Sequence, residues 1–251
     1  MSAFGLRVRA AWLLTVLCVG CPPAAWPQEQ IDLPTRPGIT QPIYLTVARN
    51  PIASAVLFPG GSGVVSAVRN NFLIRVTGQF AAAGVTVAVA DAPSDHAWGL
   101  DVGVRASEAQ AADAAAIVAF LRSRAAVPVW LIGTSNGSIS AANAGVRLGP
   151  PSIAGVVLTS SVWAGGMSMV PLNNLRVPVL IVHNRGDTCR TSPFAQAEKA
   201  LDVLSTAPAK QFIAVSSDVL RGNPCEALSP HGYFGIEVQV VPPIVGWIKT
   251  H

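Results

Sequence analysis

The pentapeptide Gly-x-Ser-x-Gly at residues 133–137 is the feature of the sequence that most directly suggests chemistry. A serine hydroxyl is a poor nucleophile at neutral pH until a base removes its proton during the attack. The pentapeptide alone is a weak signal, but Val127–Ile132 before it reads as a buried strand and Gly137–Ala144 after it as a helix. A sharp turn between strand and helix would expose the Ser135 hydroxyl at the positive end of the helix dipole. This context predicts a nucleophilic Ser135; the alternative is a glycine-rich turn without chemistry.

The strands and helices that must position this turn are indicated by apolar runs that alternate with helical patterns. The strand candidates are mostly continuous apolar runs, which is typical of strands buried on both faces of a parallel sheet. They are Ile43–Val47, Ala53–Phe58, Val85–Ala90, Val127–Ile132, Ile153–Leu158, Val177–His183 and Gln211–Val215. The helical stretches are Ala67–Ala83, Ser107–Arg124, Gly137–Arg147, Ser192–Leu204 and Gly235–Thr250. Pro242 and Pro243 should start or kink the last helix rather than lie inside it. The alternation predicts an α/β fold, with a mostly parallel central sheet and helices on both faces.

The chain resembles the α/β-hydrolase superfamily over nearly all of residues 43–251. No linker divides the chain after residue 41, so we expect a single domain over residues 42–251. The resemblance implies a triad in the chain order serine, acid, histidine. The segment between Leu158 and Val177 holds no long insertion, so we expect no large lid. No cofactor and no metal are expected for this chemistry.

The same resemblance assigns the other two members of the triad. In the family the acid follows a late strand, as Asp187 does here after Val177–His183, and Asp218 is the alternative. The histidine lies in a loop before the last helix, which fits His231. The remaining histidines fit less well: His96 precedes the serine, His183 ends a strand and His251 is the last residue.

The family also uses two backbone N–H groups to stabilise an oxyanion. Asn136, directly after the nucleophile, should supply one of them, and Gly61, with Gly60 as the alternative, should supply the other. Family members often carry a histidine before such glycines, where this chain has Phe58 and Pro59, so the match is partial.

Two tryptophans, Trp98 and Trp163, are candidates for the substrate pocket. Trp98 follows the strand candidate Val85–Ala90 at the edge of the sheet that faces the site. Trp163 follows Ile153–Leu158, where the resemblance implies the acyl pocket. The alternative for each is a place in the core or on the surface.

The composition indicates a folded protein without an electrostatic case for nucleic acid. Hydrophobic residues make up 51% of the 251 residues, charged residues make up 12%, and the formal net charge is +4. Without Arg7 and Arg9, which lie in a segment expected to be removed, the balance is 15 basic against 13 acidic residues. No run of Lys or Arg could follow a phosphate backbone.

The N-terminus has the pattern of an export signal, over residues 1–25. A basic region precedes the apolar run Ala10–Gly20, which is too short to span a bilayer. An ordinary signal peptidase could cleave near Ala24–Ala25, whereas Cys18–Cys21 resembles a bacterial lipoprotein signal that would place a lipid on Cys21. The alternative is a buried N-terminal helix. Residues 26–41 are polar and proline-rich, and we expect a leader before the fold.

Two cysteines, Cys189 and Cys225, lie outside this signal. An exported protein with two cysteines suggests one disulfide. The bridge would join the loops that the resemblance gives to Asp187 and His231, whereas the alternative is two unrelated buried thiols.

These observations predict an exported serine hydrolase, periplasmic or secreted, that cleaves a small or polymeric carboxylic ester. A peptidase or thioesterase would use the same triad, because function lies in the pocket rather than in the fold. A non-catalytic binding protein on the same fold is the alternative from another class.

Overall fold

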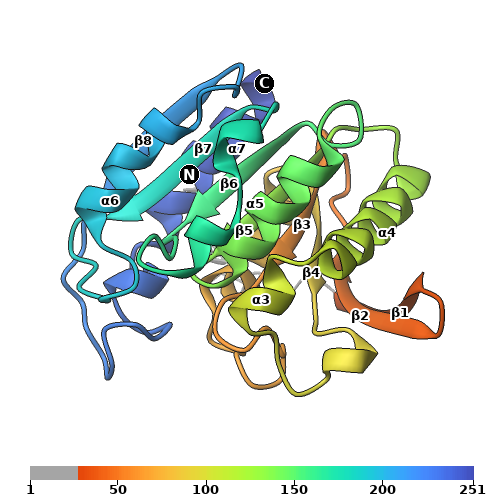
Figure 1. Cartoon of the computed structure of the whole chain (residues 1–251), viewed down its shortest axis with the longest axis horizontal. Coiled ribbons are helices and arrows are strands. Elements are labelled where there is room, and N and C mark those ends of the chain that lie inside the picture. Colours follow the sequence, from red (N-terminus) through yellow and green to blue (C-terminus); the bar gives the residue numbers. More distant parts are fainter. Residues whose placement is uncertain (1–27) are drawn as a thin grey trace, which may run out of the picture.

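The structure, a computed structural model, describes residues 28–251 and is built on one 8-stranded sheet (Figure 1). The strand order is β1-β2-β4-β3-β5-β6-β7-β8. The strands are β1 (Gln28–Arg36), β2 (Ile39–Thr46), β3 (Ala53–Phe58), β4 (Val85–Ala90), β5 (Val129–Thr134), β6 (Gly155–Thr159), β7 (Val179–Asn184) and β8 (Lys210–Val215). The pairs from β4 to β8 are parallel, while β1 with β2 and β2 with β4 are antiparallel. The expected signal, residues 1–25, lies outside the described residues.

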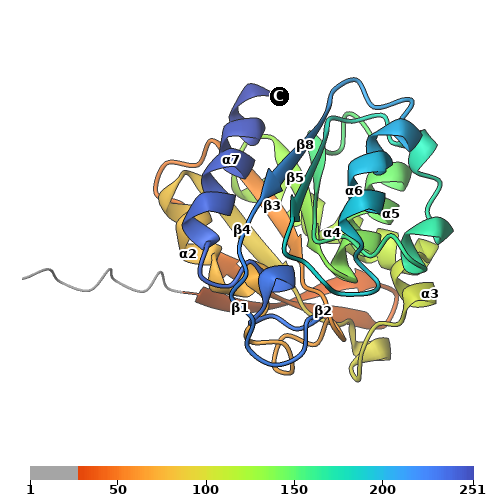
Figure 2. The same ribbon diagram turned by 90° about the vertical axis from the view of Figure 1, so that its left-hand side faces the viewer.

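Helices cover both faces of this sheet (Figure 2). They are α1 (Phe72–Arg75), α2 (Thr77–Ala82), α3 (Val102–Arg105), α4 (Glu108–Arg124), α5 (Gly137–Leu148), α6 (Phe194–Lys199) and α7 (Glu237–Thr250). Helices α2 and α7 lie on one face, and α3, α4, α5 and α6 lie on the other. Every residue of β3, β4, β5 and β7 is buried, which is why these strands read as continuous apolar runs. The predicted α/β fold with a mostly parallel sheet is confirmed.

The N-terminal edge of the sheet differs from the expected leader. Residues 28–36 form β1, whose Ile31 pairs with Ile43 of β2. Alternate side chains of β1 are exposed because it is an edge strand, and an edge strand also tolerates Pro34. Arg36 at its end makes ion pairs with Asp113 of α4 and with Asp95. The polar composition of this segment reflects a half-exposed strand and not an extended leader.

Two helices also differ from their predicted limits. The helix expected over residues 67–83 begins only at Phe72, because the Asn71 side chain accepts a hydrogen bond from the Leu73 N–H and caps α1 there. Residues 66–71 are thereby left as a loop. Pro242 and Pro243 lie inside α7 rather than at its start. Pro242 has no N–H, so it cannot donate to the carbonyl of Val238, four residues earlier. Both residues are exposed, so water can reach that carbonyl.

The C-terminal edges of the parallel strands are open, as expected. Between β6 and β7, the chain forms only the short 3₁₀ turns Gly166–Met169 and Leu172–Asn174, so no large lid covers this edge. None of the helices within residues 28–251 is long and apolar enough to cross a membrane.

Candidate active site

Ser135 lies in the tight turn between β5 and α5, in a backbone conformation that only a constrained site retains. Its φ is 53°, a left-handed value that is unfavourable for a residue with a side chain. The turn closes because its flanking residues are glycines. A Cβ on Gly133 would lie 2.3 Å from the Gly137 carbonyl oxygen, and one on Gly137 would lie 1.9 Å from that of Phe58. The Ser135 N–H donates to Thr159 of the neighbouring strand β6, which fixes the turn to the sheet.

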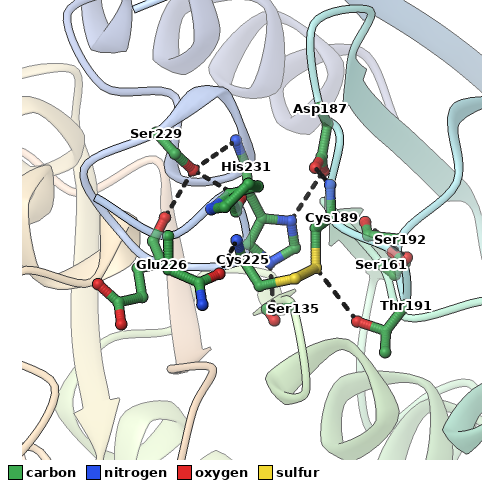
Figure 3. The surroundings of a disulfide bond; sticks show 12 residues. Ser135, Ser161, Asp187, Cys189, Thr191, Ser192, Cys225, Glu226, Ser229 and His231 are labelled. Atoms are coloured by element: carbon green, nitrogen blue, oxygen red, sulfur yellow. Dashed lines mark hydrogen bonds and ion pairs between the residues drawn. A yellow bond between two sulfur atoms is a disulfide. The ribbon is translucent and has the colours of Figure 1, made fainter. Parts of the chain in front are cut away.

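His231 stands between Ser135 and Asp187 (Figure 3). Its Nε2 is 2.9 Å from the Ser135 Oγ, and its Nδ1 is 2.7 Å from the Asp187 Oδ2. In a neutral imidazole, an Nδ1–H donates to the carboxylate, which leaves Nε2 to accept the serine proton. Residues that lie 96 and 44 positions apart in the chain therefore form one continuous line of hydrogen bonds.

The carboxylate of Asp187 is buried and held from a second side. Its Oδ1 accepts a hydrogen bond from the Cys189 N–H at 2.9 Å. His183, at the end of β7, is 3.5 Å from Oδ2 and donates from Nε2 to the Ser192 carbonyl. Burial lowers the pKa of His183, so it stays neutral and does not compete with His231 for the negative charge. Asp218, the alternative acid, is exposed in the loop after β8.

The loop that carries His231 is anchored to the sheet by Tyr233. The fully buried Tyr233 hydroxyl donates to the Val182 carbonyl and accepts from the Ser160 N–H, and burial raises its pKa. Phe72 packs against its ring, with a centroid distance of 4.7 Å. Tyr233 therefore fixes the histidine loop to β6 and β7. Tyr233 is not among the site residues predicted from the sequence, and its position two residues after the histidine was the available signal.

Asn184 connects the acid loop with the histidine loop and was also missed. Its side-chain oxygen accepts from the Gly186 and Ser217 N–H groups, and its Nδ2 donates to the Pro230 carbonyl. One amide side chain thus joins the end of β7, the end of β8 and the residue before His231. A polar residue at the end of an otherwise apolar strand was the signal.

The structure contains the disulfide between Cys189 and Cys225, with a Cα–Cα distance of 4.6 Å. Figure 3 shows it beside His231, joining the acid loop to the segment that precedes the histidine. Cys189 is buried, whereas Cys225 is exposed. Asp187, Cys189 and His231 also group closely enough to suggest a metal site. A disulfide sulfur offers no thiolate, however, and the other two residues already bond to each other.

The glycine loop after β3 packs directly against the nucleophile. A Cβ on Gly60 would lie 2.7 Å from the Ser135 Cβ. Gly61 has a φ of 60°, and its carbonyl accepts from the Asn136 side chain at 3.3 Å. Asn136 directly precedes α5, where the first N–H groups of the helix lack partners within the helix. The structure therefore brings Gly60, Gly61 and Asn136 together around Ser135.

A cavity of about 540 Å³ opens onto Ser135 and His231. Gly61 lies on one side of it, and the walls come from residues 66–72 and from the loop that contains Arg221 and residues 225–228. Cys225 is part of this wall, so the disulfide also holds the rim of the cavity.

The predicted pocket tryptophans do not line this cavity, which corrects that expectation. Trp98 is 99% exposed, in the turn that follows the 3₁₀ helix Ser94–His96. Trp163 lines a separate cavity of about 650 Å³ with Met167 and Leu172, which shares no lining residue with the first. Strand order predicts that both residues lie near the carboxyl ends of the parallel strands. The direction of a side chain in a turn does not follow from strand order.

The fold is shared with many known structures, although the sequence matches no family model and no curated protein. A predicted CIB-like hydrolase from Thermoplasma acidophilum has 16% identity and a TM-score of 0.61, covering 90% of this chain and 99% of that one. A lidless α/β serine hydrolase from Xanthomonas campestris has 14% identity and a TM-score of 0.58, covering 92% and 94%. An esterase from Pyrococcus furiosus has 11% identity and a TM-score of 0.64, covering 89% and 91%. The chain has the α/β-hydrolase fold.

Proposed function

We propose that the protein is a serine hydrolase that cleaves a carboxylic ester through an acyl-enzyme. The observation that carries this proposal is the line from Ser135 through His231 to Asp187, with distances of 2.9 and 2.7 Å. A buried serine–histidine–carboxylate chain beside a cavity is the arrangement that activates a serine hydroxyl for acyl transfer.

The first half of the reaction transfers the acyl group to the enzyme. Ser135 Oγ attacks the ester carbonyl carbon while His231 Nε2 takes its proton. The Asp187 carboxylate holds the ring in the required tautomer and stabilises the imidazolium. The tetrahedral intermediate collapses when the imidazolium gives its proton to the departing alkoxide, which leaves as the alcohol.

The second half repeats these steps with water. His231 removes a proton from the water that attacks the acyl-enzyme, and the same proton then returns to Ser135 Oγ as the acid leaves. In both halves, the backbone N–H groups of Asn136 and Gly61 are the proposed donors to the oxyanion, with Gly60 as the alternative for the second. A preorganised donor of this kind contributes about 10²–10³ in kcat.

The open cavity supports small ester substrates, or polymeric ones that bind at the surface. The same triad would serve a thioesterase or a peptidase. The neighbouring structures do not separate these reactions, since a dipeptidyl peptidase from Porphyromonas gingivalis shares the fold at 12% identity, with this chain covering 35% of that one. Only short 3₁₀ turns lie between β6 and β7, which supports small or surface-bound substrates, and the substrate panel below separates esters from thioesters and peptides.

We also propose that the protein is exported, to the periplasm or outside the cell. The disulfide Cys189–Cys225 supports this location, because such bonds persist in oxidising compartments. The proposed signal covers residues 1–25, with a lipoprotein signal that leaves a lipid on Cys21 as the alternative.

Substrate panels with matched variants test the function. The purified protein should hydrolyse short-chain p-nitrophenyl esters faster than thioesters or peptide anilides. Ser135→Ala should abolish turnover with an unchanged circular dichroism spectrum, while Ser123→Ala, an exposed serine at the end of α4, should keep it. Faster cleavage of thioesters or anilides would change the substrate class. Equal activity in wild type and Ser135→Ala would refute the nucleophile.

A further inference from the structure

Arg105, at the end of α3, is a buried cation without an acidic partner. Only 1% of the residue is exposed. Within residues 28–251, no carboxylate lies within ion-pair distance of its guanidinium. Burial lowers its pKa to about 10, so the side chain is still charged at neutral pH. The protein therefore keeps an uncompensated positive charge inside the fold.

The guanidinium donates to three segments: the loop before α3, helix α5 and the glycine loop after β3. Nε donates to the Leu100 carbonyl at 3.3 Å, Nη1 donates to the Ser140 hydroxyl at 3.1 Å, and Nη2 donates to the Gly61 carbonyl at 3.2 Å. Ser140 is on α5, the helix that begins two residues after Ser135 (Figure 1). One side chain thus joins the nucleophile helix to the glycine loop.

The position of Arg105 is itself constrained from two sides. Asn143, also on α5, donates from its side chain to the Arg105 carbonyl at 3.2 Å. Gly63 provides the space for the guanidinium, because a Cβ there would lie 2.7 Å from Nη2. The space next to Gly63 and the hydrogen bond from Asn143 therefore fit an arginine at position 105.

Stability does not account for this residue. Taking a charge out of water carries a large desolvation penalty, and neutral acceptors offset it only in part. An apolar side chain of similar length would fill the same space without that penalty. A role in the glycine loop explains its presence better.

We propose that Arg105 is a positioning residue that sets the oxyanion hole by fixing the Gly61 peptide relative to helix α5. The inference rests on the proposed function. Gly61 has a φ of 60° and no side chain, so its backbone can rotate freely unless it is held. Its carbonyl accepts from both Arg105 and Asn136, which holds the peptide after the Gly61 Cα from two sides and limits rotation of the backbone at Gly61.

Loss of Arg105 should therefore weaken transition-state binding more than substrate binding. Arg105→Met keeps most of the volume and removes the three donors. We expect its kcat for a p-nitrophenyl ester to fall by at least tenfold, with KM changed less than threefold. Its affinity for an alkylboronic acid, which forms a tetrahedral adduct with the serine, should fall in parallel with kcat. Arg105→Lys keeps the charge and should recover part of both.

Arg36→Met is the matched control, because it removes a paired arginine that joins β1 to α4 and lies outside the site. It should lower the melting temperature without changing kcat or boronic acid affinity below the transition. If Arg105→Met behaves like Arg36→Met in kcat, or if KM rises while kcat is kept, the proposal is overturned.

Hydrogen exchange separates a failure of this inference from a failure of the proposed function. If the wild type neither hydrolyses esters nor reacts with a serine probe, the proposed function fails by itself. Amide exchange over residues 59–64 still decides the role of Arg105. Faster exchange there in Arg105→Met and Arg105→Lys, but not in Arg36→Met, supports positioning of the loop; unchanged exchange overturns it.

Discussion

The disulfide Cys189–Cys225 should stabilise both the fold and the active-site loops, and Cys225→Ala is the variant that tests this. Cys225 is exposed and Cys189 is buried. Removing the exposed partner breaks the bridge without opening a cavity, so packing and cross-linking effects stay separate. The bridge closes a loop with a sequence separation of 36.

The magnitude follows from that loop. In the chain-entropy model, a closed loop of this length is worth about 4 kcal/mol, and measured values are often lower. For a chain of this size, each kcal/mol shifts Tm by roughly 2–4 °C. The expected fall in Tm is therefore up to about 8–16 °C. Activity should fall about tenfold, because the Cys189 N–H holds Asp187 and the Cys225 segment forms the cavity wall, and small displacements of catalytic groups are costly.

The assay combines thermal unfolding with ester turnover, each with and without dithiothreitol. Reductant should lower Tm and kcat of the wild type and leave those of Cys225→Ala unchanged. A thiol count on the denatured, non-reduced mature protein should find none. Two free thiols would refute the bridge. If kcat is unchanged while Tm falls, the bridge stabilises the fold but does not align Asp187 with His231.

Four further predictions follow from individual contacts. Tyr233→Phe should lower the free energy of unfolding by about 1–3 kcal/mol, since the Val182 carbonyl and the Ser160 N–H lose a buried partner. It should also lower kcat, because His231 is two residues away. Denaturant unfolding measures the first effect and ester turnover the second. Gly60→Ala should lower kcat by at least tenfold, because its Cβ would lie 2.7 Å from that of Ser135. Gly246→Ala in α7, whose Cβ would meet no atom within 4 Å, should leave kcat unchanged in the same assay. His183 has a lowered pKa in the folded state, so the unfolded chain binds more protons below about pH 6.5. The free energy of unfolding should therefore fall as the pH drops through this range. In chemical denaturation at several pH values, His183→Gln should reduce the slope of the unfolding free energy against pH by the equivalent of up to one bound proton. His231→Ala should reduce kcat about as severely as Ser135→Ala, because the members of a triad act as a unit, and single-turnover kinetics with an activated ester checks this.

The sequence predicts those parts of the molecule that local pattern determines. The strands around Ser135 are continuous apolar runs, and the glycines at positions 133 and 137 mark the turn, so both the fold and the nucleophile position follow from neighbouring residues. Asp187 and His231 required chain order from a family resemblance, because nothing local separates Asp187 from Asp218.

The parts that the sequence did not predict depend on contacts between distant segments. β1 was expected as a leader because an edge strand carries polar residues and a proline that resemble an extended segment. Arg105 and Tyr233 act on residues 44 and 51 positions away, Gly61 and Val182, and no periodicity signals such partners. Trp98 and Trp163 follow the expected strands, but Trp98 is exposed to solvent and Trp163 lines the separate cavity. The direction of a side chain in a turn does not follow from strand order.

Labelling of Ser135 tests the central claim most directly. The wild type, Ser135→Ala and Ser123→Ala are each treated with a fluorophosphonate, and intact mass and peptide mapping locate the adduct. The proposed triad predicts one adduct, on Ser135, in the wild type and in Ser123→Ala, and none in Ser135→Ala. An unlabelled wild type that is folded, or an adduct that persists in Ser135→Ala, would contradict it.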